Sequence, residues 1–284
     1  MRFAKGHGTG NDFVIVPDLD GKLTLSPALA AALCDRHFGI GADGVLRVVR
    51  SAAAGVDQAA EWFMDYRNAD GSLAEMCGNG IRVFARYLIE EGLTFGPEVA
   101  IATRAGTRTV RAEADGQLTV DMGPVAVLGE GAVEAGSQLL VGLAISVGNP
   151  HLACVIDAPV EAVDLTSPRV LEPAALAGGV NVEIVRLVGP REIAMRVHER
   201  GSGLTLSCGT GAIAAAVAAA WSAGERPAGW HAAPWTVHVP GGRLAVALGA
   251  TASLLTGPAE VVARGHLAAS WLARQRPPAG VGSA

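Results

Sequence analysis

The hydrophobic positions of this chain form short runs that are typical of β-strands. Each run is β-branched or alternates apolar with polar residues, and each is bounded by Gly, Pro or Asp. The pattern predicts strands at 13–16, 45–49, 99–103, 118–122, 154–156, 193–198, 236–239 and 244–248. One more strand, near Val261, is expected to return to the first half of the chain.

Helical signals lie between these runs. Ser-Pro at the start of 26–34 is a helix start, and apolar residues repeat at helical spacing over 81–92 and 213–224, where glycines end both repeats. The two longer helices each follow a Cys-Gly-x-Gly sequence. Cys77 and Cys208 are therefore expected at helix N-termini.

The chain repeats one plan in its two halves. Four features occur in the same order in both: Gly-Asn, an acid or amide 32 residues later, a hydrogen-bonding residue, and, nine positions beyond it, a cysteine. They fall at Asn11, Asp43, Asn68 and Cys77, and again at Asn149, Asn181, Glu199 and Cys208. The first half carries seven extra residues, which we expect as a longer loop over 51–58.

These elements predict an α+β fold with two pseudo-symmetric halves. Each half is expected to be a mostly antiparallel β-sheet wrapped around a central helix, with the active site in the cleft between them. The N-terminal half would comprise 1–124 and 258–284 and contribute Cys77, and the C-terminal half would comprise 125–257 and contribute Cys208. The tail 276–284 is expected to be disordered.

Composition and charge narrow the classes of function. Half of the 284 residues are hydrophobic, 17% are charged, and the net charge is −5 without a basic run, so neither nucleic acid nor a membrane surface is an expected partner. The longest apolar stretch is far short of the ~20 residues that cross a bilayer, and no signal core follows Met1. A cytoplasmic location is therefore expected. Seven scattered histidines predict no metal site.

The four cysteines differ in their setting, and no two form a Cys-x-x-Cys pair, so reduced thiols are expected. Cys34 and Cys154 lie in apolar segments and are expected in the core. A glycine-flanked cysteine at a helix start is typical of a reactive thiol, because the helix dipole lowers its pKa and nearby N–H groups bind anions. A small buried hydrophobe is the alternative for Cys77 alone, but less so for two cysteines in equivalent positions.

Two thiols that face one carbon from opposite sides are what a racemase or epimerase needs. One group removes the α-proton as a thiolate and the other delivers a proton as a thiol. An amino-acid substrate also needs donors for its carboxylate, which helix N–H groups and Arg200 supply. Its ammonium needs acceptors, and the candidates are Glu199 and the side-chain oxygens of Asn11, Asn68, Asn149 and Asn181.

Eight motifs occur in order from Lys5 to about Gly265 and together resemble the diaminopimelate epimerase family. They are Lys5-Gly-His-Gly-Thr-Gly-Asn11-Asp-Phe, Gly39-Ile-Gly-Ala-Asp43-Gly, Asn68-Ala-Asp-Gly-Ser, Met76-Cys77-Gly-Asn79-Gly-Ile-Arg82, Val147-Gly-Asn149-Pro-His151, Gly179-Val-Asn181-Val, His198-Glu199-Arg200-Gly and Ser207-Cys208-Gly-Thr210-Gly. The match covers about nine tenths of the chain.

The resemblance implies a cofactor-free, homodimeric enzyme that interconverts LL- and meso-diaminopimelate for lysine and peptidoglycan synthesis. It implies Cys77 and Cys208 as proton donor and acceptor, with His151 and Glu199 tuning the thiols. The implied substrate-binding residues are Asn11, Asn68, Gly78, Asn79, Asn149, Asn181, Glu199, Arg200, Gly209 and Thr210.

Two positions depart from the family pattern. Some members carry a substrate-contacting glutamine where this chain has Gly44, and many carry a glutamate where it has Leu204. Neither change removes a catalytic group. Both concern the distal part of the pocket, which distinguishes one amino acid from another.

Other functions explain fewer of these motif residues. The closest is a racemase of another amino acid, such as histidine, that uses the same two thiols; a dithiol redox protein would use them as a couple. A pyridoxal phosphate racemase would need Lys5 or Lys22 and a phosphate cup, and a non-catalytic binding module leaves the paired thiols unexplained. The Gly-x-Gly-x-x-Gly sequence at 39–44 precedes a strand, the reverse of the dinucleotide-binding context.

Several charged residues near the motifs have simpler interpretations. Asp65, Asp70 and Glu75 are interpreted as turn or solvated charges in preference to acid–base groups. Arg82 follows the first glycine turn. It could orient the cleft or face solvent, and the sequence does not separate the two.

Overall fold

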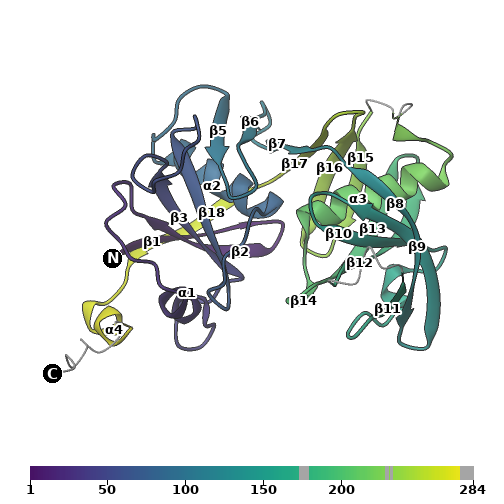
Figure 1. Cartoon of the computed structure of the whole chain (residues 1–284), viewed down its shortest axis with the longest axis horizontal. Coiled ribbons are helices and arrows are strands. Elements are labelled where there is room, and N and C mark those ends of the chain that lie inside the picture. Colours follow the sequence, from purple (N-terminus) through teal and green to yellow (C-terminus); the bar gives the residue numbers. More distant parts are fainter. Residues whose placement is uncertain (173–178, 228–229, 231–232, 276–284) are drawn as a thin grey trace. The chain divides into compact units, whose positions relative to one another are not determined.

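The computed structural model describes residues 1–172, 179–227, 230 and 233–275, and within them the chain forms two compact units (Figure 1). Unit 1 comprises Met1–His7, Asp12–Val110 and the chain from Ala259 onward, and unit 2 comprises Gly8–Asn11 and Arg111–Pro258. The pseudo-symmetric halves bounded at 124 and 258 stay a prediction. The tail expected at 276–284 lies outside the described residues.

Unit 1 is built mainly from seven strands and three helices. They are β1 (Arg2–Gly8), β2 (Asn11–Pro17), α1 (Pro27–Cys34), β3 (Gly44–Arg50), β4 (Trp62–Asn68), α2 (Gly78–Glu90), β5 (Glu98–Ala102), β6 (Arg108–Ala112), β18 (Glu260–His266) and α4 (Ala269–Arg274).

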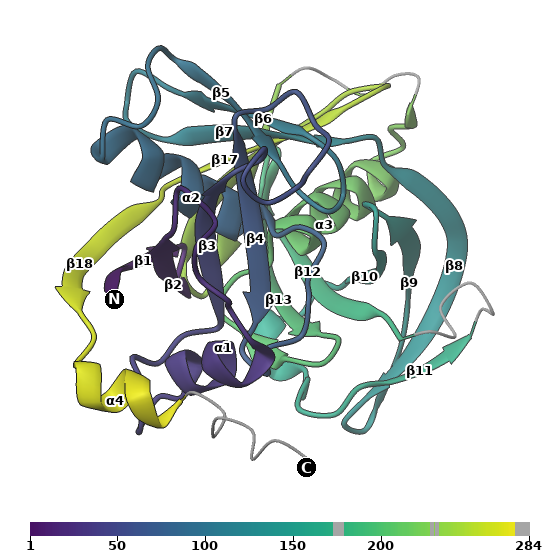
Figure 2. The ribbon, with the colours of Figure 1, turned by 60° about the vertical axis from the view of Figure 1, so that its left-hand side comes forward.

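The sheet of unit 1 mixes parallel and antiparallel pairs in the order β18-β1-β2-β3-β4-β5. The pairs β2–β3 and β4–β5 are parallel because a helix, α1 or α2, carries the chain back across the sheet between them. Figure 2 shows β18 running beside β1, its antiparallel partner. Helix α2 buries Ile81, Phe84 and Leu88 and packs on β3, β4, β5 and β18.

Unit 2 contains eleven strands, one α-helix and a 3-10 turn among the described residues. They are β7 (Leu118–Gly123), β8 (Ala126–Ala135), β9 (Gln138–Ser146), β10 (Pro150–Val155), η1 (Val160–Ala162), β11 (Arg169–Glu172), β12 (Asn181–Gly189), β13 (Glu192–Glu199), β14 (Gly203–Thr205), α3 (Gly209–Ser222), β15 (Trp235–Val239), β16 (Gly242–Leu248) and β17 (Ser253–Gly257).

The central element of unit 2 is α3, which is apolar on every side and buried over 211–220 (Figure 1). It packs on β10, β12, β13 and β16. The helix connects two parallel strands, β13 and β15, just as α2 connects β4 and β5 in unit 1. Most other pairs of unit 2 are antiparallel.

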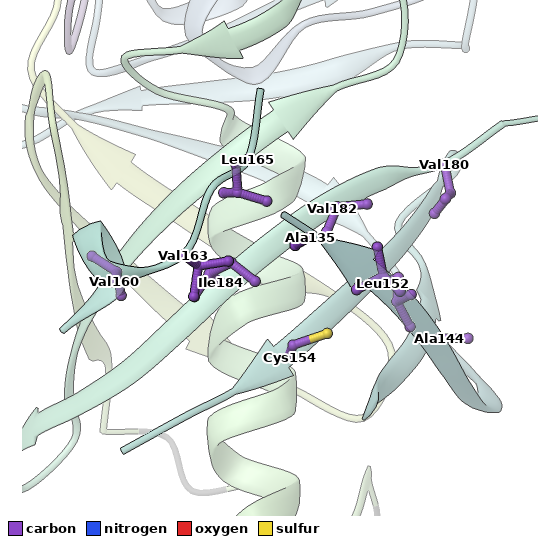
Figure 3. Packing of buried hydrophobic residues seen from close by; sticks show 11 residues of the cluster. Ala135, Ala144, Leu152, Cys154, Val160, Val163, Leu165, Val180, Val182 and Ile184 are labelled. Atoms are coloured by element: carbon purple, nitrogen blue, oxygen red, sulfur yellow. The ribbon is translucent and has the colours of Figure 1, made fainter. Parts of the chain in front are cut away.

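A second core of unit 2 gathers on one face of β10 and β12, where Leu152, Cys154, Val182 and Ile184 pack together (Figure 3). Successive residues of a strand point to opposite faces, so His151 and Glu183 point away from this cluster. In the parallel pairing of β10 and β12, His151 lies opposite Asn181, and Glu183 lies two residues further along β12. The polar residues of these strands therefore share one face.

The sequence-based strands and helices are confirmed where their signal was strong. Each of the eight predicted runs coincides with a strand, all three helices begin where predicted, and 51–58 is a turn-rich loop. The pattern missed β1, β4, β8, β9 and β12, which are rich in glycine or small residues, or are apolar without alternation. It also missed β6, β11, β14 and β17, which are only three to five residues long. No helix among the described residues is long and apolar enough to cross a membrane.

An ion-pair network joins the start of β2 to the start of β3. Asp12 accepts hydrogen bonds from Lys5 Nζ at 2.6 Å and from two nitrogens of Arg36 at 2.8 and 3.1 Å. Arg36 also donates to Asp43, whose backbone pairs with that of Asp12. Burial alone would raise the pKa of Asp12, but the hydrogen bonds from Arg36 and Lys5 outweigh it and lower the pKa to about 2.

Asp12→Asn is therefore expected to lower the free energy of unfolding by about 2 kcal/mol at pH 7, because each unit of pKa depression is worth ~1.4 kcal/mol. In the unchanged protein this stabilisation is complete above about pH 4 and is lost as the pH falls through about 2. The stability of the variant should change less over that range. Urea unfolding followed by circular dichroism at several pH values measures both effects.

The matched control is Asp20→Asn, because Asp20 is 61% exposed and pairs with Lys22 and Arg50 at the surface. Its loss is expected to stay within about 0.5 kcal/mol at pH 7. Equal losses in the two variants would show that the network of Asp12 contributes no more than a surface ion pair.

Candidate active site

Cys77 caps the N-terminus of α2. Its backbone is extended, with φ −143° and ψ 122°, and its sulfur accepts a hydrogen bond from the backbone N–H of Gly80 at 3.4 Å. The position is usually taken by Ser, Thr, Asp or Asn, whose oxygen binds the same orphan N–H group. The fold thus holds a partly exposed thiol at the positive end of a helix.

Cys208 caps α3 in the same way. Its φ and ψ are −126° and 122°, and its sulfur accepts from the N–H of Gly211, again at 3.4 Å. Cys208 is only 6% exposed. The two cysteines, one in each unit, therefore share one local geometry, as predicted from the paired Cys-Gly-x-Gly sequences.

Unit 1 brings Asn68 to the carboxyl end of β4, the strand that precedes the crossover through α2. Its amide donates to Ser72 Oγ at 3.0 Å within a turn. Gly78 and Asn79 form the first turn of α2, and Asn79 is fully buried, accepting a hydrogen bond from Arg82 at 2.8 Å. Asn79 therefore has a structural partner inside the helix as well as its expected role.

Unit 2 brings Thr210, Asn149 and His151 close to Cys208. The hydroxyl of Thr210 lies 3.4 Å from the sulfur, and the amide of Asn149 donates to Thr210 Oγ1 at 3.4 Å. His151 is fully buried, with Nε2 3.1 Å from Asn149 Oδ1. Gly209 is the first residue of α3.

Glu199 ends β13, the strand before the α3 crossover, and so takes the place in unit 2 that Asn68 takes in unit 1. Thr205 Oγ1 donates to its carboxylate at 2.5 Å, and the carboxylate also forms a hydrogen bond with the side chain of Cys208. Burial raises the pKa of Glu199.

Asn181 and Arg200 are joined by a backbone contact, the N–H of Arg200 donating to Asn181 Oδ1 at 2.9 Å. The guanidinium of Arg200 is exposed, and its Nη1 donates to the carbonyl of Gly179 at 3.5 Å. Asn11 is half-buried at the start of β2, within the segment that belongs to unit 2.

The expected fall in thiol pKa is wrong for Cys208. Burial raises its pKa well above 9, and the nearby carboxylates of Glu199 and Glu183 raise it further, while Thr210 and Gly211 act in the opposite direction. The helix N-terminus does not compensate for removing a charge from water. Cys208 is therefore a protonated thiol near neutral pH.

Sequence analysis missed two residues beside Cys208. Glu183 is fully buried and lies 2.6 Å from His151 Nδ1; the available signal was a single charge inside the apolar run Asn181–Val185. Thr9 is also buried and donates to Ser207 Oγ at 2.6 Å. Its φ of 50° is an outlier for a β-branched residue, which no sequence pattern indicates.

Two interpretations of charged residues are corrected. Arg82 has no exposure and donates to the Gly78 carbonyl at 2.9 Å, so the solvent-facing alternative is wrong. Asp65 is 3% exposed and forms ion pairs with Arg47, Arg67 and Arg104, so it is neither a turn residue nor a solvated charge.

The other two acids near Asp65 fit their interpretation. Asp70 accepts a hydrogen bond from the backbone N–H of Ser72 in an exposed turn, and Glu75 is exposed.

Replacing Gly44 with the glutamine that some family members carry would require neighbouring atoms to move. A Cβ at this position would lie 2.6 Å from the Arg67 carbonyl and 2.7 Å from the ring of Tyr66. Leu204 is 43% exposed on β14.

Curated relatives match nearly the whole chain. A diaminopimelate epimerase of Thermobifida fusca is 55% identical over 280 residues, which cover 96% of this chain and 100% of that protein. One of Streptomyces coelicolor is 50% identical over 280 residues, covering 96% of this chain and 97% of its own. A third, of Mycobacterium sp. (strain KMS), is 48% identical over 294 residues and 98% of its length.

Solved structures share the fold at much lower identity. A hydroxyproline epimerase from Agrobacterium vitis superposes with a TM-score of 0.66 at 16% identity, covering 93% of this chain and 91% of its own. A probable proline racemase from Agrobacterium radiobacter K84 gives 0.68 at 15% identity, covering 94% and 93%. At such identity these matches establish the fold alone.

The family model described as diaminopimelate epimerase matches residues 3–128 and 143–262, which include both capping cysteines and every candidate site residue. With the full-length relatives at about half identity, this match is decisive: the chain belongs to the diaminopimelate epimerase family.

Proposed function

We propose that the protein is an isomerase that interconverts LL- and meso-diaminopimelate by proton transfer at the α-carbon. The observation that carries the proposal is the pair of cysteines in one capping geometry, one in each unit, in a chain of this family. Inverting a carbon needs an acid and a base of similar strength on opposite faces, and two thiols supply both.

The protonation of the two thiols sets the starting direction. Burial and two carboxylates keep the proton on Cys208, so Cys208 is the group that donates in the first turnover. Cys77 then has to act as the base. After one turnover the roles are exchanged, and the reverse reaction restores the first state.

Recognition of the substrate is assigned to the polar residues near the two caps. The carboxylate at the reacting carbon would be held by the N–H groups of Gly78, Asn79, Gly209 and Thr210 together with Arg200. The ammonium would be held by Glu199 and by the side-chain oxygens of Asn11, Asn68, Asn149 and Asn181. His151 and Glu199 would tune the thiols.

The proposed organisation follows from the chemistry. Both thiols must reach one carbon, so we assign Cys77 to a half formed by 1–124 and 258–284, and Cys208 to a pseudo-symmetric half formed by 125–257, with the substrate in the cleft between them. We also propose a cofactor-free homodimer in the cytoplasm, acting in lysine and peptidoglycan precursor synthesis.

The direct test is proton NMR of LL-diaminopimelate in D2O with the purified protein. Loss of the α-proton signal together with appearance of the meso isomer is the expected result. Activity on histidine but not on diaminopimelate would assign the protein to another substrate, and thiol oxidation coupled to a disulfide acceptor without α-proton exchange would make it a redox protein.

Cys77→Ala and Cys208→Ala are each expected to reduce epimerisation below about a hundredth of the unchanged rate, because the carbon is then served on one face only. On transition-state arithmetic this is a loss above ~2.7 kcal/mol. The controls are Cys34→Ala and Cys154→Ala, at buried thiols whose pKa burial raises to about 12. Residual activity above a hundredth in either test variant would contradict the two-base mechanism.

Arg200→Lys is expected to raise KM about tenfold with a smaller effect on kcat, because an ammonium cannot form the two parallel hydrogen bonds that a guanidinium makes with a carboxylate. Steady-state kinetics on diaminopimelate measure both constants. Arg243→Lys, at an exposed arginine of β16, is the control and should leave both unchanged. If KM of Arg200→Lys stays within twofold, Arg200 does not bind the carboxylate.

A further inference from the structure

Glu183 is a buried acid to which the proposed reaction assigns no role. It is fully buried on β12, on the face opposite the apolar cluster, and its Oε1 lies 2.6 Å from Nδ1 of His151, which is also fully buried. Its other oxygen, Oε2, has no hydrogen-bond partner among the described residues. A half-satisfied buried carboxylate costs stability, so packing alone does not explain it.

Glycine at 211 makes room for this carboxylate. A Cβ on Gly211 would lie 2.8 Å from Glu183 Oε1 and 3.4 Å from the sulfur of Cys208. The acid is thus beside the first turn of α3, on the same side as the thiol. The glycine that Cys208 uses for its helix cap also admits Glu183.

Three further contacts connect the pair to Cys208. His151 Nε2 lies 3.1 Å from Asn149 Oδ1, Asn149 Nδ2 donates to Thr210 Oγ1 at 3.4 Å, and Thr210 Oγ1 lies 3.4 Å from the sulfur. Together with the contact between Glu183 and His151, they form one continuous path of five side chains from Glu183 to Cys208.

The hydrogen bonds along this path have one direction. Glu183 and His151 share a proton between Oε1 and Nδ1, and whichever atom holds it, Nε2 keeps its own proton because it faces the carbonyl oxygen of Asn149. The NH2 group of that amide then faces Thr210, whose oxygen accepts. The hydroxyl proton of Thr210 is left to point at the sulfur.

We propose that Glu183 is a positioning residue of the Cys208 site, and that it orders a chain through His151, Asn149 and Thr210 in which every donor points toward the sulfur. This inference rests on the proposed function, since it gives the chain its use: stabilising the thiolate when Cys208 has lost its proton. No proton travels along the chain.

A carboxylate at 183 strengthens the last donor, because its negative charge polarises the 2.6 Å hydrogen bond to His151 and each bond that follows. A neutral amide lacks this charge, so the hydroxyl of Thr210 would donate more weakly. The direct charge of Glu183 acts in the opposite sense, since it repels a thiolate at Cys208 and also acts on Glu199 of β13 and Cys154 of β10. The two effects have opposite signs, so an experiment can separate them.

The test is the rate at which methyl methanethiosulfonate modifies Cys208 at pH 8.5, measured by peptide mass mapping with Cys77 as the internal reference. The reaction needs the thiolate, so its rate follows the thiolate fraction. Glu183→Gln and Thr210→Val are each expected to slow modification of Cys208 about tenfold relative to Cys77, as one unit of pKa would. Thr210→Ser, which restores the hydroxyl, should recover the rate.

The matched control is Glu192→Gln, which removes the acid of a second close Glu–His pair in the described part of unit 2. Glu192 lies 2.6 Å from His238 Nε2, the same distance as in the buried pair, but both side chains are 42% exposed. This variant should leave the rate at Cys208 unchanged. A tenfold change in it would mean that the effect of Glu183→Gln is not specific to the chain.

The double variant Glu183→Gln/Thr210→Val completes the test. If Glu183 acts on Cys208 through the hydrogen-bond chain, adding Thr210→Val to Glu183→Gln slows the modification of Cys208 no further. Faster modification of Cys208 in Glu183→Gln, or an equal additional effect of that change in the Thr210→Val background, would overturn the proposal in favour of direct repulsion. Should Glu183→Gln fail to fold, Thr210→Val alone still tests the last link, because Thr210 is half-buried; an unchanged rate there overturns the proposal.

The modification rate requires no turnover. It therefore tests the hydrogen-bond chain even if the protein fails to epimerise diaminopimelate. If the hydrogen-bond chain is disproved, the epimerisation assay still tests the proposed function.

Discussion

The candidate site depends on two sulfur atoms that take the place of oxygen at the N-termini of α2 and α3. Sulfur is a weaker hydrogen-bond acceptor than the oxygen of Ser, Thr, Asp or Asn, so Cys77 and Cys208 are not the best caps for helix stability. The crossovers place each cap after a strand, β4 or β13, whose last residue, Asn68 or Glu199, is polar. The polar strand end, the capping thiol and the helix N–H groups thus form one structural motif, which occurs once in each compact unit.

The surroundings of the two caps differ in charge. Arg82 is buried within α2 and interacts favourably with a thiolate at Cys77, whereas the carboxylates of Glu183 and Glu199 surround Cys208. Burial lowers the pKa of Arg82 to about 10, so it remains a cation near neutral pH. The same capping geometry therefore stands beside a buried cation at Cys77 and beside two carboxylates at Cys208, where burial and these carboxylates raise the pKa of the thiol. The two caps therefore differ in electrostatic surroundings although they share one geometry.

How far the sequence predicted the molecule depended on the kind of signal. Backbone features with a local cause, such as the Ser26 cap of α1, the cysteine caps and the apolar period of α2, were predicted because neighbouring residues decide them. The state of single polar residues was not. Asp65 was interpreted as a turn or solvated charge, but three arginines from β3, β4 and the segment after β5 surround it.

Glu183 was missed for a related reason. It is buried against His151 only because β10 and β12 pair in parallel, and residues 32 positions apart become neighbours. The prediction that the pKa of Cys208 is lowered was wrong for the same reason. The helix dipole can be inferred from neighbouring residues in the sequence, whereas the burial of the thiol cannot. Tertiary pairing decided each of these cases.

The pairing of β18 with β1 has a consequence for synthesis of the protein. Unit 1 begins with the first residues of the chain, yet one edge of its sheet is completed by Glu260–His266, which leave the ribosome after all of unit 2. Until then β1 presents an unpaired edge, and such edges promote aggregation. Unit 2, whose strands lie in one continuous stretch from 111 to 258, can close its core around α3 first. The second unit of the sequence is therefore the first able to fold, and the N-terminal strand must wait for its partner.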